Sequence, residues 1–346
     1  MCIDAQTFAD VLTDPAGAET ISAAAGCPLV IVRADSTGSA PALAGLDIAA
    51  LPAVVVAVAA DPSCLPSDCF AAADVILTED GEAGAPFVRP EGGVQAGLTA
   101  IETALTASPV AGTSLALLLR TSAGLGVPAG LVAESATYST LQAGAEFIRW
   151  RSARPARAPE PEATRVVTER RGDELRIVLS RPTRRNAVDR RMRDALAEAL
   201  AVAIADGGLN VVLSAAGPDF CAGGDLDEFG SRPDPAAAHV IRLTRSPALL
   251  MHRLSARTTA YLHGACLGAG IELPAFAGRV VAAPETRLGL PEVSLGLVPG
   301  AGGTVSLPHR IGRWRTAFLA LTGQQLTADQ ALAWGLVDEI QPRDQH

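Results

Sequence analysis

Two glutamates between residues 263 and 304 have the spacing and neighbours needed for acid–base chemistry. Glu272 follows a glycine-rich turn at 264–270, and Glu292 precedes a second glycine cluster at 300–303. Glycine lets the backbone approach a ligand closely, and the start of a helix offers unpaired N–H groups to an anion. Two carboxylates beside such donors could form an acid–base site. Spacing alone does not exclude the alternative that both glutamates are surface residues with no shared role.

The elements that must position these glutamates alternate between strands and helices. Short apolar runs predict strands, and an Ala/Leu-rich amphipathic run capped by Asp189 predicts a helix. The predicted elements are a hairpin at 166–179 around the turn 171–173, a helix at 189–206, a strand at 210–214, a helix at 235–255 and strands at 259–262 and 279–283. This alternation favours right-handed crossovers and a largely parallel sheet, with ligands at the strand-to-helix turns.

The first 150 residues carry similar patterns but no reactive constellation. Strands are predicted at 28–32, 53–59 and 73–78, and helices at 93–106, 114–122 and 128–150. A proline-rich stretch at 152–164 is typical of a linker between domains. We therefore predict an N-terminal domain at 1–151, the linker at 152–164 and a C-terminal domain at 165–346.

The amino-acid composition argues against some classes of binding partner. The 346-residue chain has a net charge of −9 and contains arginine but no lysine. This acidity disfavours nucleic acid and anionic membranes as general partners. The longest apolar stretch, residues 51–60, is about half a membrane span, and no signal-peptide pattern precedes it. The six cysteines lack metal-ligand spacing, which favours free thiols in a reducing cytoplasm over disulfides.

Five sequence blocks resemble the crotonase superfamily, the enoyl-CoA hydratase/isomerase family. They occur in order within residues 166–340 and read RPTRRNAV, FCAGGDL, HGACLGAGIEL, LGLPEVSLGLVPGAGGT and LTGQQLTADQALAWGLVDEI. The resemblance implies an α/β protein with a β–β–α superhelix and a mainly parallel sheet. It also implies a homo-oligomer, a trimer or a hexamer.

The same resemblance implies roles for particular residues. The N–H groups of Gly224 and Ala269 would polarise the thioester carbonyl of an acyl-CoA. Glu272 would act as the base toward water, and Glu292 would protonate the α-carbon. The coenzyme A substrate would be bound by nine further residues: Arg184, Arg185, Ala187, Ala222, Asp225, Leu226, Gly268, Pro291 and Gly300. No metal and no cofactor is implied beyond the coenzyme A of the substrate.

Retention of both glutamates favours an enoyl-CoA hydratase, because isomerases of the family often keep only the carboxylate that corresponds to Glu292. Another acyl-CoA reaction on the same oxyanion hole, such as isomerisation, decarboxylation or thioester hydrolysis, is the close alternative. A non-catalytic acyl-CoA-binding subunit is the alternative of another class. Pro274 favours that alternative, since a proline two residues after Glu272 is expected to kink a helix.

Family members continue for several helices beyond the point that corresponds to residue 340. Residues 97–155 resemble those missing helices, and residues 51–80 loosely resemble the segment that carries Glu272 without its glycine turn. We hypothesise that the N-terminal half is a degenerate, non-catalytic crotonase-like unit. Its helices, 128–150 in particular, are expected to pack on the acyl pocket of the C-terminal half.

Overall fold

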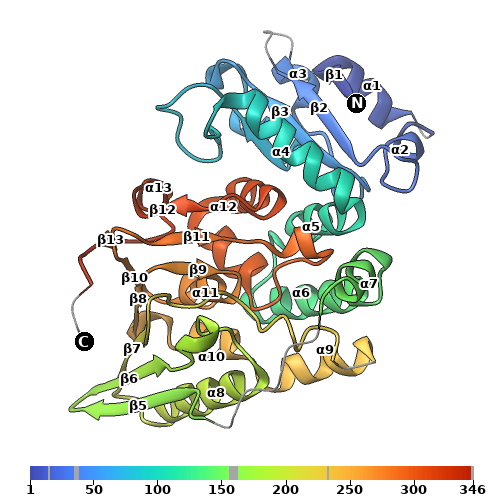
Figure 1. The fold of residues 1–346 in the computed structure, drawn as a ribbon. Helices are drawn as coiled ribbons and strands as arrows, with labels where there is room; N and C mark the ends of the chain where they lie inside the picture. Colours follow the sequence, from blue (N-terminus) through green and yellow to red (C-terminus); the bar gives the residue numbers. More distant parts are fainter. Residues whose placement is uncertain (15, 35–38, 156–162, 232–233, 344–346) are drawn as a thin grey trace.

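The computed structural model describes residues 1–14, 16–34, 39–155, 163–231 and 234–343. Helices and strands alternate along most of the chain, which confirms the predicted α/β class. Figure 1 shows a smaller N-terminal lobe above a larger body, with a column of helices leading from one to the other.

A six-stranded sheet forms the centre of the body. Its strand order is β13-β10-β8-β7-β6-β5, and all neighbours are parallel except the hairpin β5–β6. The strands are β5 (Val166–Arg171), β6 (Glu174–Leu179), β7 (Asn210–Ala215), β8 (Thr258–Leu262), β10 (Arg279–Ala282) and β13 (Glu339–Ile340). The predicted hairpin and the three predicted strands that follow it are therefore confirmed.

A second, three-stranded sheet lies beside the first. The chain passes from the large sheet to this small sheet and then into a helix, which gives β–β–α units. The small sheet has the order β12-β11-β9, with β9 (Ala265–Leu267), β11 (Arg287–Gly289) and β12 (Leu326–Thr327). Strand β8 of the large sheet continues into β9 and the short helix α11 (Ala269–Glu272). Strand β10 likewise continues into β11 and, further on, α12 (Gly303–Thr322); α13 (Ala328–Trp334) follows β12. This repetition is the predicted β–β–α superhelix.

The helices of the body show where proline changes the predicted boundaries. Helix α8 (Arg190–Ala205) begins as predicted, with the Asp189 side chain accepting from the Met192 amide. The single helix predicted at 235–255 is wrong. Two helices, α9 (Pro235–Thr244) and α10 (Pro247–Arg253), are separated where Ser246 caps the second one. Proline has no N–H for the helix ladder and fits the first turn, so a new helix starts at Pro247.

Pro274 also ends a helix rather than bending a long one. Helix α11 stops at Glu272, and a 3₁₀ turn (Pro274–Phe276) begins directly afterwards. The expected kink is therefore a change of helix type, and Glu272 remains in a regular α-turn ahead of the proline.

The N-terminal lobe contains a four-stranded parallel sheet in the order β1-β2-β3-β4. Its strands are β1 (Cys2–Asp4), β2 (Leu29–Arg33), β3 (Val54–Val58) and β4 (Val75–Leu77), and its helices are α1 (Ala5–Thr13), α2 (Gly17–Thr20) and α3 (Ser39–Leu43). Strands β2, β3 and β4 were predicted from unbroken apolar runs, which are typical of a parallel sheet covered on both faces, whereas β1 was not predicted. One face packs into a core of its own lobe, and the other joins the core of the body.

Four helices connect the lobe to the body. They are α4 (Gly93–Ala107), α5 (Pro109–Ser122), α6 (Val127–Gln142) and α7 (Ala145–Ser152). The single helix predicted at 128–150 is wrong, because Gly144 separates α6 from α7. Buried residues of α4, α5 and α6 belong to the same continuous core as those of α12.

Ion pairs and hydrogen bonds secure α12 and α5 to the N-terminal sheet. The buried Arg120 of α5 donates to both carboxylate oxygens of Asp74, and Arg313 of α12 lies 3.6 Å from Asp74. The Trp314 indole donates to the Phe70 carbonyl at 3.0 Å. Residues 156–162 of the predicted linker lie outside the described residues, and the division into domains at 151 and 165 stays a prediction.

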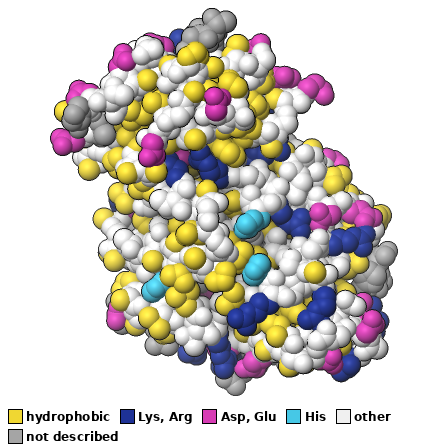
Figure 2. All heavy atoms as spheres, turned by 180° about the vertical axis from the view of Figure 1, so that it is seen from behind, with side chains coloured by type: hydrophobic (Ala, Val, Ile, Leu, Met, Phe, Trp, Pro, Cys, Tyr) yellow, Lys and Arg dark blue, Asp and Glu magenta, His cyan; other side chains and the backbone are white. Residues whose placement is uncertain are grey.

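No single helix of the described residues is long and apolar enough to cross a membrane. Helices α4 and α5 meet the length and composition criteria only as a pair, bent by 113°. On the face shown in Figure 2, basic side chains lie at the junction of lobe and body and in further groups over the body.

Candidate active site

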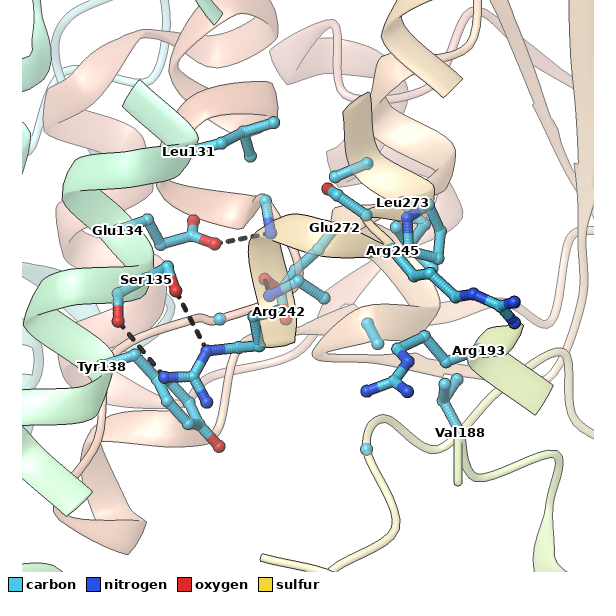
Figure 3. A pocket seen from close by; sticks show the side chains of 18 of the residues that line it. Leu131, Glu134, Ser135, Tyr138, Val188, Arg193, Arg242, Arg245, Glu272 and Leu273 are labelled. Carbon is cyan, nitrogen blue, oxygen red and sulfur yellow. Dashed lines mark hydrogen bonds between the residues drawn. The ribbon is translucent and has the colours of Figure 1, made fainter. Parts of the chain in front are cut away.

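A cavity of about 260 Å³ lies where α6 of the N-terminal half meets the body. Figure 3 shows α6 forming one wall, with Leu131, Glu134 and Tyr138 pointing inward. The opposite side is formed by α11 with Glu272 and by the loop that precedes α8, and the end of α9 lines the cavity next to α6. Segments more than a hundred residues apart in the sequence therefore share one cavity.

The two predicted glutamates converge in this cavity. Glu272 is 2% exposed, and its Oε2 atom accepts from the amides of Ala301 at 2.7 Å and Gly303 at 2.9 Å. Glu292 follows β11 and is 7% exposed. A Cβ atom placed on Gly268 would lie 2.2 Å from Glu292 Oε1 and 3.6 Å from Glu272 Oε1. The two carboxylates thus face the same point beside the glycine turn.

Burial changes the acidity of both carboxyl groups. It raises the pKa of Glu272 to about 7, although the two amides that bond the carboxylate act in the opposite direction. Burial, followed by the charge of Glu272, raises the pKa of Glu292 well above its usual value. Within the described residues Glu292 Oε2 has no hydrogen-bond partner. The pair therefore favours one carboxylate and one protonated carboxyl near neutral pH, an arrangement suited to acid–base catalysis.

Two backbone amides lie beside the glutamates. Gly224 and Ala269 both line the cavity, and neither amide donates a hydrogen bond to any residue that the structure describes. Gly268 adopts φ 50° and ψ −123° just before Ala269, a conformation that only glycine adopts readily. The segments around the two amides touch, since a Cβ atom on Gly270 would lie 2.2 Å from the Cys221 carbonyl oxygen. The segments that carry Gly224 and Ala269 are therefore neighbours at the edge of the cavity.

A third buried glutamate, Glu134 of α6, was not predicted. Its Oε1 atom accepts from the Gly302 amide at 2.7 Å, and its Oε2 atom accepts from the amide and hydroxyl of Thr304 at 2.9 and 2.7 Å. Burial, followed by the charge of Glu272, raises the pKa of Glu134 to about 8. The only hint of Glu134 in the sequence was its position as the single acidic residue among the residues that form α6.

An arginine from α9 fixes the α6 wall. The Arg242 guanidinium lies 4.8 Å from the centre of the Tyr138 ring and donates to the Ser135 and Ser139 hydroxyls. Burial lowers the pKa of Arg242, and it raises the pKa of the Tyr138 phenol above its usual value. A partly buried cation that is held by hydroxyl groups and an aromatic ring thus borders the cavity.

The predicted coenzyme A residues divide into two groups. Asp225 and Gly300 line the cavity, as do the catalytic candidates Gly224, Ala269, Glu272 and Glu292. Seven do not: Arg184, Arg185, Ala187, Ala222, Leu226, Gly268 and Pro291. Arg185 is largely exposed and pairs with Asp219 at 2.7 Å. The arginines that do line the cavity were not predicted; they are Arg190, Arg193, Arg242 and Arg245.

The two predicted binding loops nevertheless form one continuous surface next to the cavity. The Ala222 amide donates to the Arg185 carbonyl at 2.9 Å, and the Val188 amide donates to the Gly223 carbonyl at 2.8 Å. Arg181 closes the arrangement by an ion pair with Asp225 at 2.7 Å. The Asp225 carboxylate is therefore engaged in an ion pair that stabilises its own loop.

Comparison with known proteins gives consistent matches over the body. The sequence profile described as enoyl-CoA hydratase/isomerase matches residues 173–346. An enoyl-CoA hydratase structure from Thermoplasma volcanium is 37% identical and covers 52% of this chain and 73% of its own, with a TM-score of 0.49. Enoyl-CoA hydratase structures from Bacillus anthracis and Mycobacterium smegmatis are each 30% identical over 52% of this chain. They match over 70% and 71% of their own lengths, both with TM-scores of 0.48.

Proposed function

Because the chain belongs to the enoyl-CoA hydratase/isomerase family, we propose that it is an enoyl-CoA hydratase, which adds water to the double bond of a trans-2-enoyl-CoA. One observation carries this proposal: two buried glutamates with raised pKa values converge in a single cavity, beside two backbone amides that have no hydrogen-bond acceptor within the described part of the chain. The substrate itself brings the coenzyme A, and the proposed reaction uses no other cofactor.

The amides of Gly224 and Ala269 would hold the thioester oxygen. Attack at the β-carbon moves electrons from the double bond to that oxygen, which becomes an enolate oxyanion. Amides fixed in advance stabilise such a charge without reorganising, and removal of one donor of this kind costs about 3–4 kcal/mol of transition-state stabilisation. The backbone contacts around Cys221 and Gly270 hold the two donors in place.

The glutamates would supply the proton transfers. With a pKa of about 7, Glu272 is substantially ionised at neutral pH and can take a proton from water as its oxygen bonds to the β-carbon. Burial and the charge of Glu272 raise the pKa of Glu292 and favour its protonated form, which can donate its proton to the α-carbon as the enolate collapses. Both new bonds form on the side of the substrate that faces the glutamates, which gives syn addition. Proton exchange with solvent then restores the starting protonation states.

A second candidate function, double-bond isomerisation, is favoured by the unequal restraint of the two glutamates. Glu272 Oε2 is held by two amides, while Glu292 Oε2 has no partner among the described residues. A single mobile carboxyl group is sufficient to move a proton between the α- and γ-carbons of an enoyl-CoA. Product analysis distinguishes the two reactions, because only hydration adds the mass of water.

The test is an assay with crotonyl-CoA and longer trans-2-enoyl-CoAs, together with 3-enoyl-CoAs for isomerisation. The protein is expected to form 3-hydroxyacyl-CoA, and Glu272→Gln and Glu292→Gln are each expected to lower kcat by at least 100-fold. The exposed Glu102 of α4 provides a matched control, Glu102→Gln, with unchanged kcat. Binding of acyl-CoA without turnover would refute the enzyme and support a binding subunit. Sedimentation equilibrium of the same samples tests the proposed trimer or hexamer.

A further inference from the structure

We propose that Glu134, supplied by the N-terminal half, is a positioning residue that holds the glycine turn at 301–304 so that this turn can orient Glu272. The proposal rests on the function proposed above, because it assigns Glu134 a role in the same reaction. Its consequence is that the N-terminal half completes the active site and does more than cover it.

Two carboxylates share four consecutive amides of this turn. The amides of Ala301 and Gly303 donate to Glu272, whereas those of Gly302 and Thr304 donate to Glu134. The turn therefore lies between a glutamate of α11 and a glutamate of α6. Neither carboxylate can lose its pair of donors without disturbing the pair that serves the other.

The turn is also held where it enters α12, because the amides of Val305 and Ser306 donate to the Gly302 carbonyl. Gly302 adopts φ 106°, and a Cβ atom on Gly303 would lie 2.6 Å from Glu272 Cγ. These glycines allow close approach but have no side chains that could anchor the turn. If Glu134 were absent, the amides of Gly302 and Thr304 would be buried donors without an acceptor, which is costly enough to shift the backbone.

The charge of Glu134 gives the residue a second effect on the site. Glu134 accepts hydrogen bonds from the turn, and the charge of Arg242 from α9 also acts on it without a direct ion pair among the described residues. The groups that act on Glu292 are Glu272 from α11 and Glu134 from α6, and both raise its pKa. Tyr138 of α6 also interacts with Glu292, and Arg242 of α9 lies against that tyrosine. At pH values above about 8, where Glu134 is largely ionised, removal of its charge should therefore make Glu292 lose its proton at lower pH.

The test combines kinetics with hydrogen exchange on the full-length protein. Glu134→Gln keeps the shape but leaves one acceptor oxygen, Glu134→Ala removes both, and Thr304→Val removes only the hydroxyl contact. Glu102→Gln is the control. With crotonyl-CoA as substrate, Glu134→Gln is expected to lower kcat by about 10- to 100-fold, the size of effect that a small misplacement of a catalytic group produces. KM should change less than threefold, and the alkaline limb of the pH profile should move to lower pH.

Amide exchange at 301–304 is measured in the same variants without ligand. Faster exchange there in Glu134→Gln, with unchanged exchange in the six-stranded sheet, supports the proposal and excludes general unfolding as the cause. Wild-type kcat, an unmoved alkaline limb and unchanged exchange in Glu134→Gln would overturn it. If the wild-type protein turns over no enoyl-CoA, the proposed function fails, and the exchange experiment still decides whether Glu134 holds the turn.

Discussion

Replacement of Glu272 by glutamine should make the protein inactive and, at alkaline pH, more stable. The glutamine carbonyl oxygen can accept from the Ala301 and Gly303 amides as the carboxylate does, so both hydrogen bonds survive. The substitution removes only the buried charge. Since burial is the main reason for the raised pKa of Glu272, the loss of that charge relieves a destabilising contribution.

The size and sign of the effect follow from proton linkage. Folding raises the pKa of Glu272 from 4.5 to about 7. Between these values the folded protein binds more protons than the unfolded chain, so stability falls as pH rises and then stays at its lower level. Each pKa unit corresponds to about 1.4 kcal/mol. Glu272→Gln should therefore gain about 3 kcal/mol of unfolding free energy above pH 8, and almost none of this gain should remain near pH 4.5.

Thermal unfolding at pH 5.0 and pH 8.5 measures the difference. A gain of about 3 kcal/mol corresponds to a rise in Tm of roughly 5 °C for a chain of this size. The control Glu102→Gln should show the same small change at both pH values, because Glu102 is exposed. An equal Tm change for Glu272→Gln at both pH values would show that Glu272 is not a buried carboxyl group with a raised pKa. Full turnover by the variant would refute its role as the base.

Three further predictions concern other parts of the site and of the fold. The wild-type kcat/KM should rise with pH through about 7 as Glu272 ionises and fall again at higher pH as Glu292 loses its proton, which a pH–rate profile measures. Gly268→Ala should lower kcat by about 100-fold, because its Cβ atom would lie 2.2 Å from Glu292 Oε1, and steady-state kinetics at constant protein stability would show this. Arg120→Ala should lower the unfolding free energy by about 3–5 kcal/mol, since it leaves Asp74 as a buried charge without its closest partner; denaturant titration tests this, and a loss below 1 kcal/mol would contradict it.

The sequence was sufficient to predict those parts of the site whose residues are close to one another along the chain. The strand, glycine turn and helix around Glu272 are contiguous, so the apolar and glycine pattern identified them together. The placement of Gly224 and Ala269 followed from a resemblance to motifs whose geometry is local to each strand-to-helix turn. The helix breaks at Gly144 and Pro247 were visible as residue types, but apolar periodicity continued across them and concealed the change of direction.

Glu134 could not be found in this way, because its partners are Gly302 and Thr304, 168 and 170 residues further along the chain. A buried glutamate in a helix looks the same in sequence as an exposed one until the packing partner is known. The arginines that line the cavity were missed for a related reason. The motif loops contain Arg184 and Arg185, whereas the packing of α8 and α9 brings Arg193 and Arg242 to the cavity.

The continuous core shared by α4, α5, α6 and α12 also bears on how the chain folds during synthesis. Helices α4, α5 and α6 leave the ribosome long before residues 303–322 are made. Their apolar faces stay uncovered by α12 until then. At the usual 5–20 residues per second this interval is on the order of ten seconds or more. During that time the nascent chain exposes an incomplete core, which closes only after the turn at 301–304 and α12 have been made.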